Sequence, residues 1–303
     1  NARPALVQTW MDYCNVLAGI AAEIVGVPSL VLSGRSYAPD NFEIFQPYMR
    51  PGYLELMSRR SFEFTNNSSA GTADYARWLG QPADRFIVVR NGFEFPTQSP
   101  IEQPHMLQRS LGIPESVPVM GTVTRFSEEK QPELWLETAE AIAARRPDAH
   151  MVAFGGGVLL DEVRAKAARS RFANRIHLPG LTLDPWTALS MMDVFVLTSR
   201  IEGLPNVLVE AQAMGVPVVT TGRGGMTETY VEGKTGLTAP SATANELAAV
   251  VLGLLDDDNR RKQMSLAAYD HARRSFGLDR MLHDTLSVFE RAAAQEASAR
   301  NLS

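Results

Sequence analysis

Hydrophobic residues in the last two thirds of the chain form short apolar runs that alternate with longer amphipathic stretches. The apolar runs predict β-strands at residues 117–123, 150–154, 175–178, 194–198 and 216–220. The amphipathic stretches predict helices at residues 132–145, 159–169, 185–191, 205–214, 244–255, 259–274 and 278–294. Strands that alternate with helices predict an α/β fold, with a parallel sheet covered on both faces. Ligands of such sheets bind at the carboxyl ends of the strands.

The first hundred residues repeat this alternation in a weaker form. The pattern predicts strands at residues 3–10, 29–33, 62–66 and 85–90, and helices at residues 11–25, 54–60 and 72–79. Residues 34–53 contain Pro39, Pro47 and Pro51, so we expect a long loop there. Residues 97–105 are rich in Pro and Gln and are interpreted as an interdomain linker. The length of 303 residues agrees with two domains.

Composition and charge narrow the class of protein. The net charge of −5 leaves no excess of Lys and Arg to neutralise a nucleic-acid backbone, so we expect no nucleic-acid partner. The single cysteine, Cys14, excludes an internal disulfide and fits a reducing compartment. The most apolar stretch, residues 16–31, is interrupted by Glu23, Gly26 and Pro28, so we predict no membrane-spanning segment.

A turn at residues 202–210 carries the most informative chemistry. Glu202 and Glu210 stand eight positions apart, on either side of Gly203, Leu204, Pro205 and Asn206, with a predicted strand before them and a predicted helix after them. The unpaired N–H groups at the start of that helix form a site suited to a phosphate. Asn206 and Glu210 are four residues apart and share a helix face, and a carboxylate there accepts two hydrogen bonds from a diol such as ribose.

This turn resembles the E-x7-E motif of the retaining GT-B glycosyltransferases of family four, the glycosyl transferases group 1, of the bacterial polysaccharide and lipopolysaccharide type. Residues 211–219 resemble the "EAMA-x-G-x-PVV" segment of that family, Gly224, Gly225 and Glu228 resemble its "GG-x-x-E", and residues 231–236 resemble its "DG-x-TG". The resemblance covers roughly residues 85–290 and is stronger in the second half.

The resemblance implies the GT-B fold, with two Rossmann-like domains that each contain a parallel sheet. It assigns residues 1–98 to a partial acceptor-side domain, residues 99–278 to a nucleotide-sugar donor domain, and residues 279–303 to a helix that returns toward the first domain. The chain starts at Asn1, and residues 3–10 resemble the family's "PD-x-V-H" strand, which follows its first strand and glycine turn. We therefore expect an incomplete N-terminal domain and a missing N-terminal segment.

The same comparison implies roles for the site residues. Gly121, Arg125 and Lys130 resemble the family's "G-x-x-x-R-x(3–4)-K", whose Arg and Lys hold the donor diphosphate. Fixed cations there stabilise the negative charge that develops as the sugar–phosphate bond breaks. Glu210 is expected to bind the nucleotide ribose. Glu202 is expected near the donor sugar, and the backbone of Gly203, Leu204, Pro205 and Asn206 at the phosphate or sugar.

Three further segments are weaker candidates for donor contacts. Gly155 begins a glycine run that lacks the Lys-Ser/Thr ending of a P-loop, so it is interpreted as a strand-to-helix turn beside the donor, and contact with the ligand stays open. Gly180 and Leu181 resemble a family segment that lines the base pocket. Arg35 stands where the family usually has a histidine; it either supplies charge to an anionic sugar or acceptor, or points to solvent.

We predict neither a metal nor another cofactor, and the donor substrate is expected to be a UDP-linked sugar. The D-x-D pattern at Asp256, Asp257 and Asp258 is interpreted as a solvated turn. The five histidines show no metal-ligand spacing with one another or with Cys14.

The expected function is transfer of a sugar to a glycan or lipid-linked acceptor with retention of configuration, in capsule or other cell-envelope polysaccharide biosynthesis. The expected location is the cytoplasm, with at most peripheral association at the inner face of the membrane. Two alternatives stay open: a domain that binds a nucleotide sugar without turnover, and a GT-B nucleotide-sugar epimerase. A nicotinamide-dependent dehydrogenase would need G-x-G-x-x-G after its first strand, and the sequence lacks it.

Overall fold

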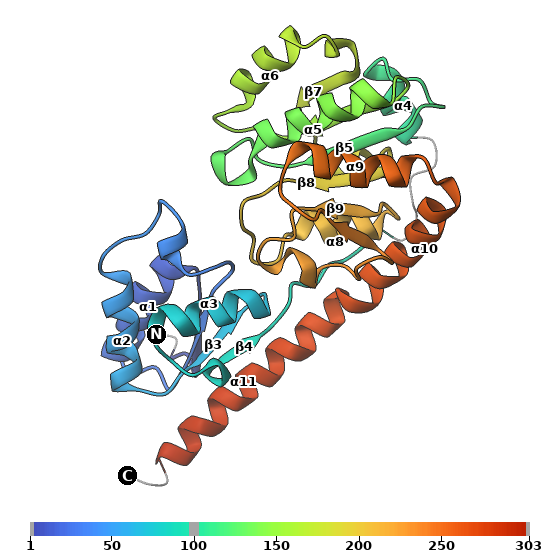
Figure 1. Cartoon of the computed structure of the whole chain (residues 1–303). Helices are drawn as coiled ribbons and strands as arrows, with labels where there is room; N and C mark the ends of the chain where they lie inside the picture. The colour runs from blue at the N-terminus through green and yellow to red at the C-terminus, as the bar shows by residue number, and fades with distance from the viewer. Residues whose placement is uncertain (1–2, 97–102, 301–303) are drawn as a thin grey trace. The chain divides into compact units, whose positions relative to one another are not determined.

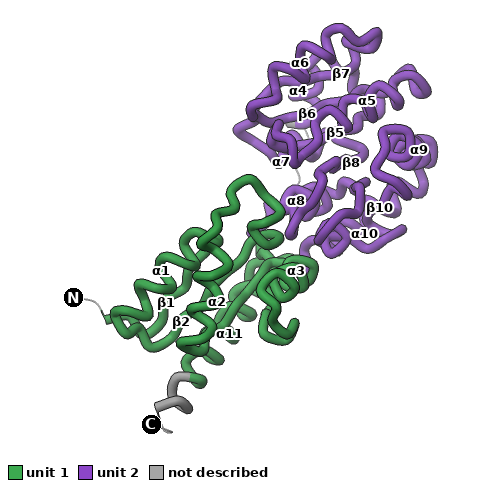
Figure 2. Tube along the Cα trace, turned by 60° about the vertical axis from the view of Figure 1, so that its left-hand side comes forward, with its two compact units in different colours: residues 1–93, 276–303 green, residues 94–275 purple. Residues whose placement is uncertain are grey.

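The computed structural model describes residues 3–96 and 103–300. The chain forms two compact units, residues 1–93 with 276–303 (unit 1) and residues 94–275 (unit 2), which Figures 1 and 2 show. Unit 2 is therefore an insertion in the chain of unit 1. The predicted linker, residues 97–105, lies outside the described residues as far as residue 102. Its last three residues belong to helix α4 (Gln103–Ser110), so the linker prediction was wrong for them.

Unit 1 is built on a four-stranded parallel sheet with the order β1-β2-β3-β4. Gln8 pairs with Val31, and Val31 pairs with Glu63. The elements of this unit are β1 (Leu6–Trp10), α1 (Asp12–Ile24), β2 (Ser29–Ser33), η1 (Pro39–Asn41), α2 (Met49–Arg59), β3 (Glu63–Asn66), α3 (Ser69–Leu79), η2 (Ala83–Arg85), β4 (Phe86–Val88) and α11 (Leu278–Arg300).

Helices cover both faces of this sheet. On one face, α1, α2 and α3 enclose an aromatic core that includes Tyr53, Phe64 and Tyr75, all at most 1 % exposed. On the other face, Val288 and Ala292 of α11 pack against Val31. The last helix is thus part of unit 1, although unit 2 separates it in sequence from the strands that it covers.

The predicted loop at residues 34–53 is shorter than expected. Helix α2 begins at Met49, so Pro51 lies in its first turn. Proline is tolerated there because a first-turn N–H has no partner within the helix. The fully buried Tyr53 then anchors the helix, and the loop prediction was wrong for residues 49–53.

Unit 2 is built on a six-stranded parallel sheet with the order β10-β9-β8-β5-β6-β7. After α4, its elements are β5 (Val119–Val123), η3 (Glu128–Lys130), α5 (Pro132–Arg145), β6 (His150–Phe154), α6 (Leu160–Arg169), η4 (Ala173–Arg175), β7 (Ile176–Gly180), α7 (Pro185–Ser190), β8 (Val194–Leu197), α8 (Asn206–Ala213), β9 (Val218–Thr220), η5 (Gly225–Glu228), β10 (Gly236–Thr238), α9 (Ala244–Leu255) and α10 (Asp258–Ser275). The pattern had predicted neither α4 nor β10, because the first is polar and the second has three residues.

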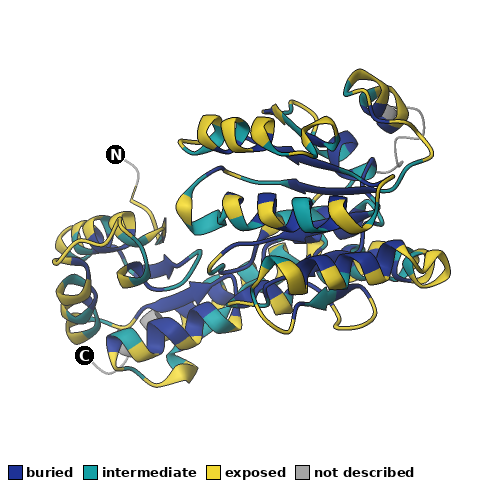
Figure 3. Cartoon of the chain, turned by 45° about the horizontal axis from the view of Figure 1, so that its top comes forward, coloured by how far each residue is buried: buried dark blue, intermediate teal, exposed yellow. Residues whose placement is uncertain are grey.

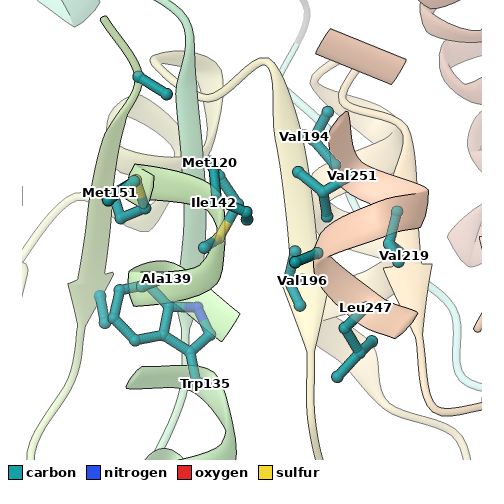
Figure 4. Packing of buried hydrophobic residues seen from close by; sticks show 14 of the residues in the cluster. Met120, Trp135, Ala139, Ile142, Met151, Val194, Val196, Val219, Leu247 and Val251 are labelled. Atoms are coloured by element: carbon teal, nitrogen blue, oxygen red, sulfur yellow. The ribbon is translucent and has the colours of Figure 1, made fainter. Parts of the chain in front are cut away.

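Two apolar layers hold this sheet between helices. Figure 4 shows one of them, in which Trp135 and Ile142 of α5 and Val251 of α9 pack against Met120 and Val194 of the sheet. The other layer joins the opposite face to α7 and α8. Figure 3 shows that the strands are buried while the outer sides of the helices are exposed.

The strand order creates a switch point between β5 and β8. The chain passes from β5 through α5 to β6 on one side of β5, and it later places β8 on the other side. The loops after β5 and β8 therefore leave the same edge of the sheet toward opposite faces, which opens a crevice between them. A ligand site is expected there.

Candidate active site

Lys130 and Glu202 meet at this switch point. Lys130 ends η3, in the loop after β5, and Glu202 follows β8. The Lys130 ammonium forms an ion pair with Oε1 of Glu202, and the hydroxyl of Ser199 donates to the same oxygen at 2.7 Å. Both charged side chains are mostly buried, with 22 % and 13 % of their surface exposed. The two loops thus present one fixed cation and one fixed anion together.

Backbone contacts hold the Lys130 loop against the end of β8. The Thr198 hydroxyl donates to the carbonyl of Lys130 at 2.9 Å, and the N–H of Arg200 donates to the carbonyl of Glu129 at 2.7 Å. Gln131 follows with φ of 49°, in the left-handed region that costs free energy for a residue other than glycine. Strained backbone beside a charged side chain is typical of a functional site.

The segment after β9 contacts the same loop. The N–H of Gly225 donates to the carbonyl of Glu202 at 2.9 Å, and Gly224, which has φ of 71°, forms an isolated bridge with Glu202. The positive φ favours glycine at position 224. The ends of β5, β8 and β9 are thereby connected around Glu202.

The turn after Glu202 leads into α8. Gly203, Leu204 and Pro205 are buried, whereas Asn206 is exposed and begins the helix, one residue later than the sequence pattern placed it. Glu210 lies one turn further along α8 and is half-buried. Its carboxylate forms no hydrogen bond or ion pair with the part of the chain that the structure describes, and burial raises the pKa of Glu210. A carboxylate held in this way has its acceptor oxygens available to a ligand.

Arg125 comes two residues after the end of β5, on the same edge of the sheet. Its side chain is 71 % exposed, and its guanidinium lies 3.9 Å from Glu129. An exposed Arg pair of this kind contributes little to stability, so the side chain is free to turn toward an anion. Arg125 and Lys130 are the two cations that the β5 loop supplies.

Gly155, Gly180 and Leu181 lie at the carboxyl ends of β6 and β7, further along this edge. The N–H of Gly155 donates to the carbonyl of Gly180 at 2.8 Å. Gly155 has φ of 139°, and a Cβ atom there would lie 1.7 Å from the carbonyl oxygen of Thr124. Only glycine fits, so its position has a structural reason. Leu181 is 81 % exposed.

Arg35 lies in unit 1, directly after Gly34 at the end of β2. It is half-buried, its guanidinium lies 4.8 Å from the centre of the Trp10 ring, and its Nη2 donates to Oδ1 of Asn91 at 2.7 Å.

Two features of unit 2 were not found from the sequence. The first is the pair of hydroxyl groups of Thr198 and Ser199, which hold Lys130 and Glu202 in place. Their position at the end of a predicted strand could have indicated this role from the sequence. His150 and His177 are joined by a 2.9 Å bond between Nδ1 and Nε2. Burial lowers the pKa of His150, and burial with the neighbouring His150 lowers the pKa of His177 to about 4. Both rings are near the amino ends of β6 and β7, away from the Glu202 loop.

No group of three His, Cys, Asp or Glu side chains gathers to hold a metal within residues 3–96 and 103–300. Across the same ranges, every helix is too short or too polar to span a bilayer.

The fold is that of the GT-B glycosyltransferases. The crystal structure of Anabaena Alr3699/HepE in complex with UDP matches 95 % of this chain and 78 % of its own, with a TM-score of 0.83 and 22 % sequence identity. Residues 106–271 match the family Glycosyl transferases group 1, which is more than half of the chain. The protein belongs to this family, as the motifs of unit 2 predicted.

Two curated relatives align with about three quarters of this chain. The Vi polysaccharide biosynthesis protein VipC/TviE of Salmonella typhi is 35 % identical over 234 residues, 76 % of this chain and 40 % of the relative. The D-inositol 3-phosphate glycosyltransferase of Kribbella flavida is 30 % identical over 233 residues, 72 % of this chain and 53 % of the relative. The chain thus spans about half the length of the curated relatives it matches.

Proposed function

We propose that this chain carries the donor site of a retaining glycosyltransferase. It would move a sugar from a UDP-linked donor to a glycan or lipid-linked acceptor, in polysaccharide biosynthesis. The observation that carries the proposal is the convergence of Lys130, Glu202 and Ser199 at the switch point of the sheet, with the unpaired Glu210 carboxylate in the helix that follows. The UDP bound to Anabaena HepE and the name of the Salmonella relative support it.

Each charged group has a part in this proposal. Lys130 and Arg125 offset the negative charge that develops on the leaving diphosphate. The Lys130 ammonium is held by Glu202, which positions it at the edge where the diphosphate would enter. Glu210 accepts two hydrogen bonds from the ribose diol. Its carboxylate oxygens accept no hydrogen bond from the described residues, so they are available to the ribose.

The proposed reaction keeps the configuration of the sugar. The bond between C1 and the phosphate oxygen breaks, and the acceptor oxygen bonds to C1 on the same face. The acceptor hydroxyl proton passes to the departing phosphate oxygen. The protein then has to position the two substrates and neutralise charge, which accounts for cations at the site.

The test is release of UDP from a panel of UDP-sugars in the presence of candidate acceptors, with the anomeric configuration of the product read by NMR. Lys130→Ala should lower the rate by about 10² to 10³-fold, the typical loss for one such donor. Lys262→Ala, on the exposed side of α10, is the matched control and should retain the wild-type rate.

The outcomes separate the proposal from its alternatives. Near-normal turnover by Lys130→Ala would show that this lysine does not act on the diphosphate. Tight UDP binding without release from any donor would favour a binding domain, and conversion of the donor sugar to its epimer would favour an epimerase. A product of inverted configuration would refute retention.

Metal independence is part of the proposal. Lys130 and Arg125 supply the positive charge that a divalent cation provides in other phosphate sites, so activity should be the same after treatment with EDTA. The measurement is the initial rate of UDP release with and without the chelator. Loss of activity that Mn²⁺ restores would overturn this expectation.

A further inference from the structure

Unit 1 contains a cavity of about 120 Å³ at the carboxyl ends of its strands. Its walls include Trp10 at the end of β1, Arg35 after β2, Thr65 near the end of β3, and Phe289 of α11. Ligands of parallel sheets bind at this edge. A water molecule occupies about 30 Å³ in the liquid, so the cavity has room for about four waters or a small polar group with part of a ring.

The Arg35 guanidinium has hydrogen-bond donors that the described chain leaves without an acceptor. Its Nη2 donates to Asn91 and its guanidinium lies over the Trp10 ring, while Nε and Nη1 have no hydrogen-bond partner in the described chain. It pairs with no carboxylate within those residues. Burial lowers the pKa of Arg35, because the charged form loses part of its hydration.

Other partly buried arginines of unit 1 show the contrast. Arg60 donates to the carbonyls of Val27 and Pro28 and pairs with Glu23. Arg280 donates to two backbone carbonyls and pairs with Asp284. Each of these guanidinium groups has both neutral acceptors and a counter-charge. A half-buried guanidinium without an anion is costly, and a ligand anion would compensate for it.

The cavity favours a carboxylate over a phosphate monoester. Arg35 is the sole basic residue among the described residues that line it, so one positive charge faces the ligand. That charge matches a carboxylate, whose two oxygens fit the fork of a guanidinium. The rest of the lining combines apolar or aromatic side chains with neutral polar ones, which suits the ring and the hydroxyl groups of a sugar. The apolar or aromatic residues include Trp10, Val89, Leu282, Val288 and Phe289, and the neutral polar residues are Gln8, Thr65, Asn66 and Thr285.

We propose that Trp10 and Arg35 form a subsite for a carboxylate-bearing sugar, in which Arg35 binds the carboxylate and Trp10 contacts the ring. The identification of this sugar as part of the acceptor rests on the proposed function. Acidic acceptor glycans would then be preferred over neutral ones. Asn91 positions Arg35 by holding Nη2, which leaves the other nitrogens for the ligand.

The experiment uses the full chain and matched probes that differ only at C6. Methyl glucuronoside carries a carboxylate, methyl glucoside a hydroxymethyl group, and methyl glucoside 6-phosphate a phosphate; the galacto series is tested in parallel. Dissociation constants are measured by ligand-observed NMR at low ionic strength. In at least one series the carboxylate should bind about tenfold more tightly than the other two probes, the gain expected for a charged hydrogen bond.

Arg35→Gln should remove this preference, and Arg35→Lys should keep part of it, because lysine retains the charge without the fork. Arg85→Gln is the matched control: Arg85 also lies over an aromatic ring of unit 1, Phe62, but it does not line the cavity. Arg85→Gln should bind all probes as the wild type does. As a second measurement, the carboxylate probe should change the tryptophan fluorescence of the wild type, and Trp10→Phe should abolish that change.

Equal binding of the probes, no measurable binding of either carboxylate, or preference for the phosphate would overturn the proposal. Persistence of the carboxylate preference in Arg35→Gln would also overturn it. UDP binding is measured separately on the same samples. Carboxylate binding without any UDP binding would leave the subsite standing while the proposed transfer failed, so the two failures are distinguishable.

Discussion

Glu210 shows how a single residue can be unfavourable for stability and suited to a ligand. The carboxylate is half-buried and lacks a partner in the described residues, so its ionised form has lost hydration without gaining a hydrogen bond. Burial therefore raises the pKa of Glu210. Above that raised pKa the folded protein carries an uncompensated charge, and below it the side chain is neutral. A ribose that donates two hydrogen bonds would favour the ionised form.

Glu210→Gln separates these two effects. At pH 7 the neutral amide removes the uncompensated charge, so the variant should melt about 2 °C higher than the wild type. This advantage should shrink as the pH falls through the raised pKa of Glu210, and it should vanish below the ordinary pKa of a glutamate, where the side chain is neutral in the folded and the unfolded state. UDP binding at pH 7 should weaken about tenfold, since a charged acceptor is lost. Melting curves from pH 4 to 8 measure the stability difference, and calorimetric titration with UDP measures the affinity. A melting temperature of Glu210→Gln below that of the wild type at pH 7 would contradict the claim that the Glu210 charge is uncompensated.

At the scale of elements, the carboxyl edge of unit 2 depends on close approach of backbone segments. Gly155 joins the end of β6 to the end of β7 through its bond to Gly180, and it leaves no room for a Cβ atom beside Thr124. The loop that carries Arg125 begins at Thr124. The turn after β6 and the cationic loop after β5 are therefore packed as one structure.

Gly155→Ala should distort this edge. Its positive φ and the clash with the Thr124 carbonyl should lower the free energy of unfolding of unit 2 by about 3 kcal/mol or more. Gly253→Ala is the matched control, because Gly253 lies in α9 with nothing within 4 Å of the added Cβ. It should raise the free energy by about 0.5 to 1 kcal/mol. Urea denaturation measures both, and equal effects of the two substitutions would refute the packing argument.

Local patterns predicted the elements well where an apolar run or a helix boundary was clear. Residues 150–154 and 132–145 have the predicted bounds, because the first is a compact apolar run and the second starts at a proline suited to the first turn. The start of α2 was missed because three prolines suggested a loop. The Lys130–Glu202 pair joins residues 72 apart, and it depends on β8 lying beside β5. Strand order of that kind is a tertiary property. The turn at residues 202–210 therefore predicted a phosphate and ribose site by itself, whereas the part of Lys130 in the site was predicted only through a family resemblance.

At the scale of the whole molecule, the chain leaves unit 1 and returns to it at one place. The N–H of Phe93 donates to the carbonyl of Phe276 at 2.9 Å, and the N–H of Leu278 donates back to the carbonyl of Phe93 at 3.1 Å. Beyond this junction α11 covers the second face of the unit 1 sheet. The stability of unit 1 therefore depends on α11, while unit 2 has cores of its own.

Val288→Ala tests this division. Val288 of α11 is 3 % exposed and packs on Val31, so loss of two methyl groups should cost about 1.5 to 2 kcal/mol. Hydrogen exchange should show faster opening of β2 and β3, with protection of β5 and β8 unchanged. Val251→Ala, at a buried α9 position in the core of unit 2, should give the reverse pattern. If either substitution reduced protection equally in both units, the units would unfold together, and α11 would stabilise more of the chain than the sheet that it covers.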